Sequence, residues 1–395
     1  MSRIDKLIAD LCPEGVEFRT LKSLARRSKG TSITAARMKV LSRPSGEIRV
    51  FAGGKTFADV DASAIPSGDV ITTPSIIVRS RGNIDFTYYD KPFSHKSEIW
   101  SYSTSQPDVE QRFIYYYLTT LTSHLQEVAR ATSVKLPQLA VKDTDLLRIP
   151  VPPLEVQREI VRALDKFTQL EAELEAELEA RRRQYEHYRS ALLSFPAGDA
   201  KSSTLGELAV RVSSGGTPHS GTPEYYESGN IPWLRSQDIN GSRVFHTGAM
   251  ITKEGLLNSS ARWIPKNCVI VAMYGATAAR VAINEIPLTT NQACCNIELD
   301  SSKADYRYVF FWIANQYETL KALGEGSQSN LNSRKIKSFP ILVPPLEEQR
   351  RIVSILDRFD SLVNDLSIGL PAELAARRKQ YEYYRDRLLT FEEKR

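Results

Sequence analysis

The sequence predicts an α+β fold, in which two mixed α/β domains are joined by two long helices that pair as a coiled coil, with a circular, pseudo-twofold duplication of the chain. The main observation is an internal repeat. Residues 151–167, VPPLEVQREIVRALDKF, return as VPPLEEQRRIVSILDRF at residues 343–359, identical at 12 of 17 positions. Residues 182–195, RRQYEHYRSALLSF, return as RKQYEYYRDRLLTF at residues 378–391, identical at 9 of 14 positions. Two copies so far apart indicate a duplicated half-protein and not a solenoid.

Length and composition place the chain among globular proteins. At 395 residues two or three domains are expected, and a hydrophobic content of 42% with a charged content of 25% is ordinary. The four cysteines form no CxxC pair and have no histidine cluster nearby, which favours a reducing compartment over a disulfide framework or a zinc site. The first residues lack an apolar core of signal-peptide length, and no stretch approaches the roughly 18 apolar residues of a membrane span. We therefore expect a cytoplasmic protein.

Basic residues gather in the first part of the chain. Between Arg19 and Arg49 there are nine lysines or arginines and one acid, Glu47. Residues 20–148 carry 18 basic and 12 acidic side chains, a net charge of +6, whereas residues 202–338 carry 13 and 11, a net charge of +2. A basic cluster on a folded domain suits phosphate contacts. A solvated basic face without a ligand has the same composition, so both interpretations stay open.

The duplication is circular. Residues 1–19 contain an amphipathic helix and a turn at CPEG, which resembles the end of the first long helix, and TLKSLA at residue 20 matches TLGELA at residue 204. We therefore expect residues 1–19 to form an N-terminal helix that completes the second helical module, although a separate docking helix fits them equally well. The predicted segments are 1–19, the first domain 20–150, the central helix 151–197, the second domain 198–342 and the C-terminal helix 343–395.

Both domains are predicted to mix strands and helices. Short β-type runs alternate with turns rich in glycine, proline and serine, and the dipeptides Val70-Ile71 and Val269-Ile270 predict an equivalent strand in the two domains. Apolar and aromatic residues at helical spacing predict one core helix near residues 109–128 and another at 306–323. The two domains otherwise share little sequence, as expected if each recognises something different.

The repeated segments predict two long helices. Paired prolines at the start of each suit the first turn of a helix, and the apolar residues that follow have the three-and-four spacing of a coiled-coil seam. The seam comprises Ile160, Leu164, Phe167, Leu174, Leu178, Tyr185, Leu192 and Phe195, matched by Ile352, Leu356, Phe359, Leu366, Leu370, Leu374, Tyr381 and Leu388. Gly369 and Pro371 predict a break or kink in the second helix.

The first helix contains a tandem repeat, EAEL-EAEL, at residues 171–178. About 42 residues at ~1.5 Å rise would form a rod of roughly 60 Å, to which each four-residue unit adds ~6 Å. That increment is nearly two base-pair steps of ~3.4 Å, so the repeat could act as a ruler along DNA. Good helix formers placed for local stability explain the same residues.

Together these features resemble the specificity subunit of a type I restriction-modification system, over essentially the whole chain. The resemblance rests on the paired P-P-L-E-x-Q-x-x-I helices, the R-[RK]-Q-Y-E-x-Y-R-x-x-L-L-x-F helix ends, the C-P-E-G-V-E phrase at residue 12 and the G-G-T-P…I-P-W…D-I opening of the second domain. The doubled EAEL resembles the T-A-E-L repeats of the type IC group, whose copy number is linked to target spacing, although glutamate here replaces the threonine.

The resemblance implies a non-catalytic DNA-binding subunit without a cofactor of its own. Two target recognition domains would each bind one half of a bipartite double-stranded DNA sequence, held apart by two antiparallel conserved helices. Those helices would dock two modification subunits, which methylate adenine, and restriction subunits would join to translocate and cut DNA. S-adenosylmethionine, ATP and Mg²⁺ would belong to these partner subunits.

Sequence motifs of catalysis are missing. No D/N-P-P-Y/F motif of amino-methyltransferases occurs, and neither HExxH nor a GxGxxG loop is found. Gly53-Gly54-Lys55-Thr56 resembles the end of a P-loop, but Arg49 stands where that motif needs its first glycine. The five histidines have no paired metal spacing. We therefore expect neither catalytic residues nor a metal site.

Candidate DNA-binding residues follow from side-chain chemistry. Phosphate contacts suit Lys29, Arg37, Lys39, Lys55 and Lys96. Base contacts suit forked or polar side chains next to strands, which are Arg79, Arg81 and Asn83 in the first domain and Thr217, His219, Arg235, Gln237, Asp238, Tyr274, Arg280, Asn291 and Gln292 in the second. A surface or capping role fits each of them equally well. Trp233 fits a core, and Tyr185, Tyr188, Tyr381 and Tyr384 fit the seam or a partner.

Two other functions stay open at the level of the sequence. A nuclease or methyltransferase could have its site in one variable domain, and methyl transfer or DNA cleavage by the purified chain alone would support it. A coiled-coil adaptor that binds only protein would show no DNA binding, even with modification subunits present. The basic stretch from Arg19 to Arg49 argues against the adaptor.

Inserting one further EAEL unit after Leu178 should lengthen the unread spacer of the target and preserve both half-sites, because the length of the helix would set the distance between the domains. Mapping of N6-methyladenine in cells that carry the variant measures this spacer. An unchanged spacer would show that the repeat is not a ruler.

Overall fold

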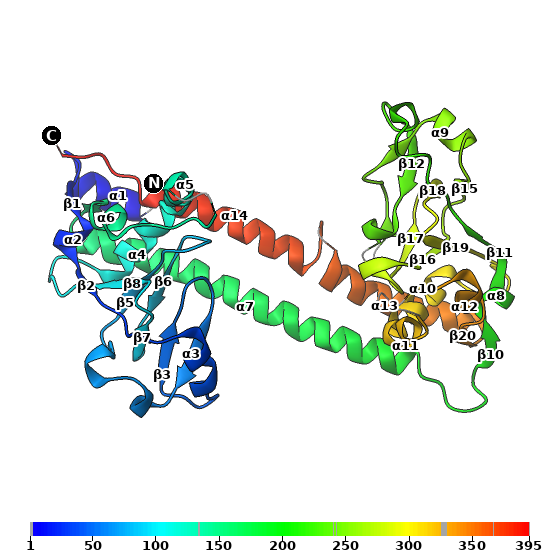
Figure 1. Cartoon of the computed structure of the whole chain (residues 1–395), viewed down its shortest axis with the longest axis horizontal. Coiled ribbons are helices and arrows are strands. Elements are labelled where there is room, and N and C mark those ends of the chain that lie inside the picture. The colour runs from blue at the N-terminus through cyan, green and yellow to red at the C-terminus, as the bar shows by residue number, and fades with distance from the viewer. Residues whose placement is uncertain are drawn as a thin grey trace. The chain divides into compact units, whose positions relative to one another are not determined.

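The computed structural model describes residues 3–132, 135–239, 241, 243–324, 330–365 and 367–394. The chain forms two compact units, one of Met1–Leu174 with Leu374–Arg395 and one of Glu175–Glu373 (Figure 1). Each unit contains one α/β domain and part of both long helices. The five predicted segments follow the sequence repeat instead of these units, and their boundaries stay a prediction.

Unit 1 contains two sheets. The larger is antiparallel, in the order β2 (Arg26–Ser28), β8 (Trp100–Ser103), β5 (Ser75–Arg79) and β6 (Asp85–Tyr89), and the smaller has the order β4 (Phe57–Val60), β3 (Ile48–Phe51) and β7 (Phe93–His95). A separate pair joins β1 (Glu17–Thr20) to β9 (Arg148–Val151). The shorter helices of this unit are α1 (Arg3–Leu11), α2 (Leu21–Leu24), α3 (Ala35–Leu41), α4 (Gln111–Thr120), α5 (Thr122–Thr132) and α6 (Val141–Asp145), with 3₁₀ turns η1 (Ala62–Ala64) and η2 (Ser67–Asp69).

Unit 2 also contains two sheets. The larger has the order β11 (Ala209–Ser214), β19 (Cys294–Leu299), β16 (Val269–Ala272), β17 (Val281–Asn284) and β13 (Arg243–Val244), and the smaller has β14 (Met250–Ile251), β12 (Ile231–Leu234), β18 (Leu288–Thr290) and β15 (Trp263–Ile264). A separate pair joins β10 (Lys201–Thr204) to β20 (Pro340–Val343). The short helices are α8 (Leu205–Leu208), α9 (Lys253–Leu257), α10 (Tyr306–Asn315), α11 (Tyr317–Ala322) and α12 (Ser333–Lys337), with 3₁₀ turns η3 (Pro223–Tyr225), η4 (Ser236–Asp238) and η5 (Gly275–Thr277).

The two domains have one topology despite their different sequences. The order β2-β8-β5-β6 of domain 1 recurs as β11-β19-β16-β17 in domain 2, and β4-β3-β7 recurs as β14-β12-β18. Within the smaller sheets, β3 and β7 are parallel, as are β12 and β18. Because strand pairing uses backbone groups, this arrangement survives extensive change of the side chains.

The predicted equivalence of Val70-Ile71 and Val269-Ile270 is wrong. Val269 begins β16, whose place in the sheet matches β5. Ile71 forms an antiparallel bridge to Phe93 at the start of β7, and Ile264 of β15 pairs in the same way with Leu288 at the start of β18. Ile71 is therefore the counterpart of Ile264, and the shared dipeptide reflects only the frequency of Val and Ile in strands.

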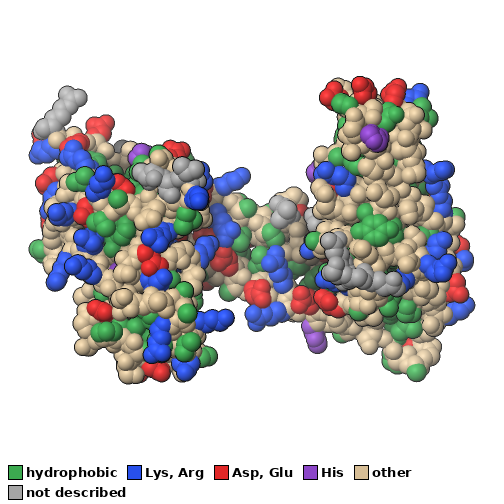
Figure 2. Space-filling model, viewed as in Figure 1, with side chains coloured by type: hydrophobic (Ala, Val, Ile, Leu, Met, Phe, Trp, Pro, Cys, Tyr) green, Lys and Arg blue, Asp and Glu red, His purple; other side chains and the backbone are tan. Residues whose placement is uncertain are grey.

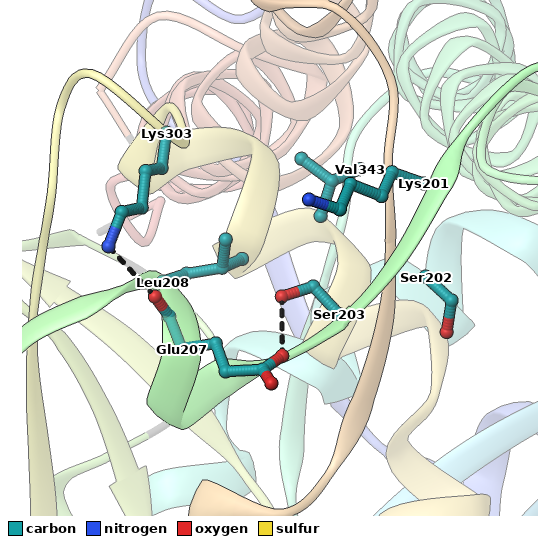
Figure 3. Close-up of a pocket in the computed structure, with 7 residues that line it drawn as sticks. All are labelled: Lys201, Ser202, Ser203, Glu207, Leu208, Lys303 and Val343. Atoms are coloured by element: carbon teal, nitrogen blue, oxygen red, sulfur yellow. Dashed lines mark hydrogen bonds between the residues drawn. The ribbon is translucent and has the colours of Figure 1, made fainter.

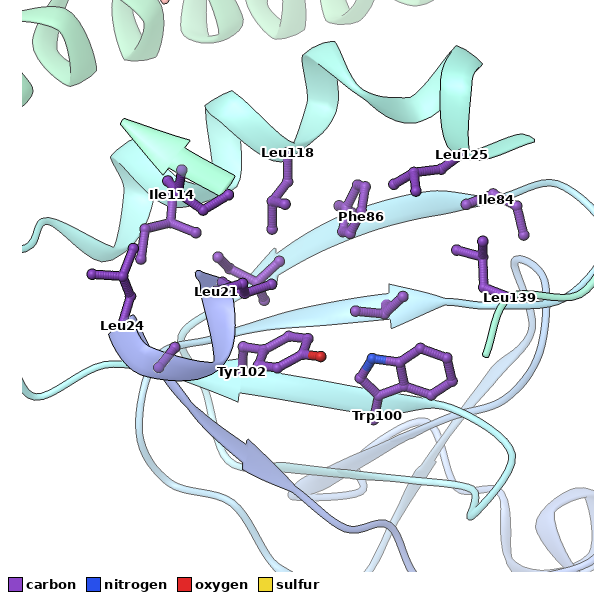
Figure 4. Close-up of a cluster of buried hydrophobic side chains, with 14 of the residues drawn as sticks. Leu21, Leu24, Ile84, Phe86, Trp100, Tyr102, Ile114, Leu118, Leu125 and Leu139 are labelled. Carbon is purple, nitrogen blue, oxygen red and sulfur yellow. The ribbon is translucent and has the colours of Figure 1, made fainter. Parts of the chain in front are cut away.

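The core of domain 1 lies between the larger sheet and the helices α2, α4 and α5. Leu21, Phe86, Ile114 and Leu118 are among its buried side chains (Figure 4). Two aromatic residues of this core share one hydroxyl: Trp100 Nε1 donates to Thr144 Oγ1 over 3.0 Å, and Tyr102 Oη, which donates to Asp145 Oδ1, lies 2.8 Å from the same atom. Since buried polar groups without partners are costly, Thr144 of α6 completes the core.

Each predicted aromatic helix is in fact two helices. The helix near residues 109–128 is interrupted at Leu121 between α4 and α5, and the helix at 306–323 is interrupted at Gln316 between α10 and α11. At the first break the hydroxyls of Thr119 and Thr120 donate to carbonyls three residues back, at 2.6 and 2.7 Å. Such bonds compete with the helical ladder, and the apolar spacing alone does not reveal them.

The first repeated helix is continuous and the second is broken. α7 (Leu154–Leu192) has 39 residues, whereas α13 (Leu346–Asn364) and α14 (Leu370–Leu388) have 19 each. The predicted break at Gly369 is confirmed: a Cβ at this residue would lie 2.4 Å from the Ser361 carbonyl oxygen, so no other residue fits the turn. Of the predicted seam, Leu366 lies outside the described residues.

Aromatic stacking pairs the long helices twice. In unit 1, Phe167 of α7 stacks on Tyr384 of α14, with ring centroids 5.6 Å apart. In unit 2, Phe359 of α13 stacks on Tyr188 of α7 at 5.4 Å. Phe359 is the repeat counterpart of Phe167, and Tyr384 is that of Tyr188, so the same contact occurs twice with the helices exchanged. The helices are therefore antiparallel, and the assignment of these tyrosines to the seam is confirmed.

A buried glutamine attaches domain 1 to α7. Gln157 is 1% exposed. Its Oε1 accepts from the Glu110 backbone N–H at 2.8 Å, and its Nε2 donates to the Asp108 and Pro152 carbonyls at 2.9 and 2.7 Å. Glu110 is the N-cap residue of α4. One amide therefore joins the start of the long helix to the start of a helix in the domain.

The same attachment recurs in unit 2. Gln349, the repeat counterpart of Gln157, is fully buried. Its Oε1 accepts from the N–H of Asp305, the N-cap of α10, at 2.8 Å, and its Nε2 donates to the Pro344 carbonyl at 2.9 Å. We call this arrangement the glutamine clamp. It gives the glutamine of the P-P-L-E-x-Q motif a physical role.

An ion pair next to each clamp differs between the halves. In unit 1, Asp165 accepts from Arg112 Nη1 and from Tyr116 Oη, both at 2.6 Å. Each carboxylate oxygen thus has a charged or polar partner.

In unit 2 the hydroxyl is missing, because Phe311 occupies the position of Tyr116. Asp357 forms an ion pair with Arg307 Nη1 at 2.5 Å, and its Oδ1 has no hydrogen-bond partner among the described residues. Burial raises the pKa of Asp357 to about 6, and the Arg307 charge only partly opposes this rise.

The chain ends of unit 1 lie together, as the circular duplication predicts. Ile4 of α1 is buried in a cluster with Leu388 and Leu389. The Val16 N–H donates to the Glu392 carbonyl and the Lys394 N–H donates to the Val16 carbonyl, both at 2.9 Å. The N-terminal helix therefore packs against the end of α14.

Replacing Gln349 by alanine should lower the free energy of unfolding by about 1–3 kcal/mol, because the buried Asp305 N–H loses its acceptor. Thermal unfolding of the purified chain measures the change. Glu347→Ala is the matched control, since this exposed residue of the same helical turn should be nearly neutral. Equal effects of the two substitutions would contradict the clamp.

The Asp357 pair predicts a pH-dependent stability. The raised pKa means that the folded chain binds a proton more tightly than the unfolded chain, so the associated stability is full below about pH 4 and is lost as the pH rises to about 6. Phe311→Tyr should supply the missing donor and favour the carboxylate. We expect it to raise the melting temperature more at pH 7 than at pH 4.

Tyr116→Phe is the reciprocal control for this prediction, since it removes the donor from Asp165 and should lower the melting temperature at pH 7. If Phe311→Tyr raised the melting temperature equally at pH 7 and pH 4, the pH-dependent stability would not come from Asp357.

Candidate nucleic-acid interface

The smaller sheet of each domain has a polar edge. Parallel strands end on the same side of a sheet, so the residues that follow β3 and β7, or β12 and β18, lie close together. Loops at the carboxyl ends of parallel strands are a common place for binding sites. We call these two positions reading edge 1 and reading edge 2.

Reading edge 1 brings four loops together. The Lys96 N–H donates to the Phe51 carbonyl at the end of β3, and the Thr31 N–H donates to the His95 carbonyl at the end of β7, at 2.8 and 2.7 Å. A Cβ on Gly53 would lie 4.0 Å from the Arg81 Cβ. The chain therefore places five predicted residues at or beside this edge: Lys29, Lys55, Arg79, Arg81 and Lys96.

These five residues differ in availability. Lys29, Lys55 and Arg81 are exposed, whereas Lys96 Nζ forms an ion pair with Glu98 Oε1 at 2.8 Å. Arg79 is only 8% exposed, and its guanidinium donates to the Gly54 carbonyl and, at 3.0 Å, to Thr87 Oγ1. Burial lowers the pKa of Arg79. Arg79 therefore shapes the Gly53-Gly54 loop, and a base contact by it would require the loss of these bonds.

The other predicted residues of domain 1 lie elsewhere. Asn83 is exposed in the turn after β5, where the Gly82 N–H donates to the Pro137 carbonyl at 2.9 Å. Arg37 and Lys39 are exposed on α3, whose Met38 packs in a different cluster with β3 and β4. Among the described contacts, none joins Arg37 or Lys39 to reading edge 1.

Reading edge 2 collects most of the predicted residues of domain 2. Arg235 follows β12 and Asn291 follows β18, and the Asn291 N–H donates to the Leu234 carbonyl at 2.9 Å. Thr217 Oγ1 donates to Gln292 Oε1. Turn η4, which contains Gln237 and Asp238, contacts η5, because Thr277 Oγ1 donates to the Ser236 carbonyl at 2.9 Å. Tyr274, which is 40% exposed, immediately precedes η5.

Two predicted residues of domain 2 are not among these contacts. His219 lies in the loop before η3, where its Nδ1 is 3.4 Å from Thr222 Oγ1. Arg280 follows η5 and lines a hollow of about 260 Å³ together with Tyr317 of α11. Trp233 is 6% exposed and donates to the Gly216 carbonyl at 3.0 Å, so its predicted core role is confirmed.

Close backbone approach explains a glycine at each edge. A Cβ on Gly30 would lie 2.2 Å from the His95 carbonyl oxygen, and one on Gly215 would lie 1.9 Å from that of Thr290. His95 and Thr290 end the equivalent strands β7 and β18. Only glycine allows the incoming loop this close to the strand, so the two loops are held in the same way.

Sequence reasoning missed one contributor to each edge. The Leu139 N–H donates to the Ser80 carbonyl after β5, and the Leu331 N–H donates to the Met273 carbonyl after β16, at 2.9 and 2.8 Å. The segments before α6 and α12 therefore border the edges. Leu139 and Leu331 are separated by the same 192 residues as the repeated prolines, since 331 − 139 = 344 − 152. The surrounding sequences differ, so this shared spacing is a signal that only the known strand order makes readable.

The basic stretch of the sequence does not form one patch. Arg27 lies on β2 near Asp145, Arg37 lies on α3, and Arg49 on β3 donates to both carboxylate oxygens of Asp59 at 2.7 and 2.9 Å. On the face drawn in Figure 2, lysine and arginine side chains of unit 1 are scattered and not gathered. The exposed cations of reading edge 1 are therefore a more specific feature than the net charge.

The Gly53-Lys55 loop is a hairpin turn between β3 and β4, closed by the Ala52 N–H bond to the Thr56 carbonyl at 3.0 Å. A P-loop leads from a strand into a helix, so the rejection of that motif is confirmed. Within the described residues, no group of three or more histidines, cysteines or acids is placed to hold a metal ion.

A hollow of about 430 Å³ lies between β10 and Lys303 (Figure 3). It reflects a difference between the halves. Ser203 occupies the position of Arg19, whose guanidinium in unit 1 donates to Asp108 at 2.5 Å. A small side chain thus leaves open in unit 2 the space that an arginine fills in unit 1.

Two domains of one topology, each with a polar edge and each clamped to a shared pair of antiparallel helices, define a scaffold with two recognition domains. The family model for the type I restriction modification DNA specificity domain matches residues 13–180 and 198–376. The chain belongs to this family.

Individual relatives agree. The EcoR124I/EcoR124II specificity subunit of Escherichia coli is 37% identical over 326 residues, which cover 78% of this chain and 79% of that protein. A putative type I specificity subunit of Haemophilus influenzae is 32% identical over 72% of this chain and 73% of its own length. The S subunit of a type I system from M. genitalium has the same fold, with a TM-score of 0.62 at 16% identity over 95% of this chain and 96% of that one.

The protein is accordingly a DNA specificity subunit of a type I restriction-modification system and not one of its catalytic subunits. Within the part of the chain that the structure describes, no helix is long and apolar enough to cross a membrane.

Proposed function

We propose that reading edges 1 and 2 each bind one half of a bipartite DNA target, and that the antiparallel helices dock the modification subunits that methylate it. The observation that carries this proposal is the duplicated edge. Two domains with different side chains place polar loops at the same point of the same topology. A protein that binds one compact ligand has no need of two such edges.

The chemistry of the edges suits DNA. Lys29, Lys55 and Arg81 supply exposed positive charge for phosphates at reading edge 1. Reading edge 2 instead has several amide side chains and the guanidinium of Arg235, which suit base edges in the major groove. The two domains would therefore contribute unequally to affinity and to selectivity.

In this proposal the chain needs no cofactor of its own. S-adenosylmethionine would bind to the modification subunits, and ATP and Mg²⁺ to the restriction subunits. The place of action would be the cytoplasm, where DNA and these partners are available.

Mapping N6-methyladenine in cells with and without this chain, in the presence of its modification subunits, tests the proposal. A bipartite motif should disappear with the chain. Exchanging residues 202–338 for the same domain of a relative should change one half of the motif and leave the other half intact, because each domain is clamped to the helices separately. If no motif disappears when the chain is absent, the proposed function is wrong. If the domain exchange changes both halves of the motif, the two domains do not recognise DNA independently.

A further inference from the structure

The guanidinium of Arg235 is held by Asp238 in a fixed orientation. Arg235 Nε donates to Asp238 Oδ2 at 3.1 Å and Arg235 Nη2 donates to Oδ1 at 3.3 Å. Arg235 is the N-cap residue of turn η4 and Asp238 is its last residue, and Asp238 Oδ2 also accepts from the Arg235 backbone N–H at 3.4 Å. The carboxylate is thus attached to both the side chain and the main chain of the arginine.

A guanidinium can form paired hydrogen bonds along two of its edges. Asp238 occupies the edge of Nε and Nη2, which leaves the edge of Nη1 and Nη2 for a second partner. Within the described residues, Arg235 Nη1 donates to no acceptor. The side chain is 35% exposed, so this free edge can reach a ligand at reading edge 2.

The neighbouring amide side chains use their acceptor oxygens within the domain. Asn291 Oδ1 lies 3.2 Å from Cys294 Sγ, and Gln292 Oε1 accepts from Thr217. Arg235 offers the edge a planar, charged pair of donors that Asp238 holds in one orientation. Its position directly after β12 fixes the backbone from which it projects.

Paired donors of this kind match the O6 and N7 acceptors of guanine in the major groove, which is the commonest specific contact of arginine with DNA. A free arginine could turn to a phosphate instead. Asp238 restrains it and reduces the rotamer entropy that binding would otherwise cost. Asp238 also repels a phosphate at the same place, because both are negative.

We propose that Arg235 reads one guanine in the half-site of domain 2 and that Asp238 is a positioning residue that acts through Arg235. This inference rests on the proposed function, since it assumes that reading edge 2 contacts DNA. Beyond the proposed function, the inference names guanine as the base that is recognised and assigns a role to each of the two side chains.

The test uses the full complex with its modification subunits and methylome mapping of four forms: wild type, Arg235→Lys, Asp238→Asn and Arg243→Ala. The wild-type motif should contain a guanine in the half-site that domain 2 recognises, which is the half that changes when residues 202–338 are exchanged. Arg235→Lys keeps the charge but loses the fork, and should reduce discrimination for that guanine by roughly 5- to 150-fold. Asp238→Asn should relax the same single position less severely.

Arg243→Ala is the matched control, because Arg243 forms an ion pair with Glu285 in the same domain but on β13 of the larger sheet. It should leave the motif unchanged. The double variant Arg235→Lys/Asp238→Asn should be no more relaxed than Arg235→Lys alone, because a positioning residue has no effect once its arginine is gone.

The outcomes separate this inference from the proposed function. A bipartite wild-type motif that stays unchanged in Arg235→Lys and Asp238→Asn, or that has no guanine in this half, overturns the reading role and leaves the function standing. The absence of any bipartite motif with the wild-type chain overturns both. If Asp238→Asn lowers the melting temperature so far that methylation of both halves is lost, Arg235→Lys alone still decides.

Discussion

The buried amides of Gln157 and Gln349 are the contacts on which the rest of the structure depends. Each satisfies backbone groups from a long helix and from a domain at once, in a place that water does not reach. A buried amide tolerates few geometries, since an unmet donor or acceptor is expensive. The clamp therefore fixes how each domain meets its own part of the helices, and the Phe167 and Phe359 stacks then pair those helices.

The residues that attach each domain to the helices are different from the residues at its reading edge. The residues that hold a domain in place lie at the base of α4 or α10 and in the paired strands, where the two halves agree. The residues at the reading edges lie on loops at the carboxyl ends of parallel strands, where the halves differ. Side chains at the edges can change without disturbing the clamp, and this explains how one fold carries two unrelated surfaces.

The parts of the fold that sequence predicts are those set by local spacing. The helical seam and the break at Gly369 follow from periodicity and from backbone sterics. The antiparallel pairing of the helices is expected from the family resemblance. The equivalence of Val70 with Val269 failed because strand order is a long-range property. At the break between α4 and α5, threonine hydroxyls bond to the backbone, and hydrophobic spacing does not reveal such bonds.

The candidate site shows the same limit. Chemistry alone selected Arg235, Asp238 and Arg79 as similar candidates, yet the fold gives them different environments. Arg79 is buried against the Gly54 carbonyl, whereas Arg235 is oriented by an acid three residues away. Leu139 and Leu331 were overlooked because their contribution is a backbone hydrogen bond, which any residue type could make.

The pair Tyr116 and Phe311 has a methodological consequence. One molecule contains two copies of the same arginine–aspartate pair, one with a hydroxyl beside it and one without. Both experience the same buffer, temperature and concentration in every sample. Site-resolved carboxyl signals from Asp165 and Asp357 would therefore serve as an internal reference for each other: when Phe311→Tyr or Tyr116→Phe changes one site, the other site reports any change in conditions within the same sample.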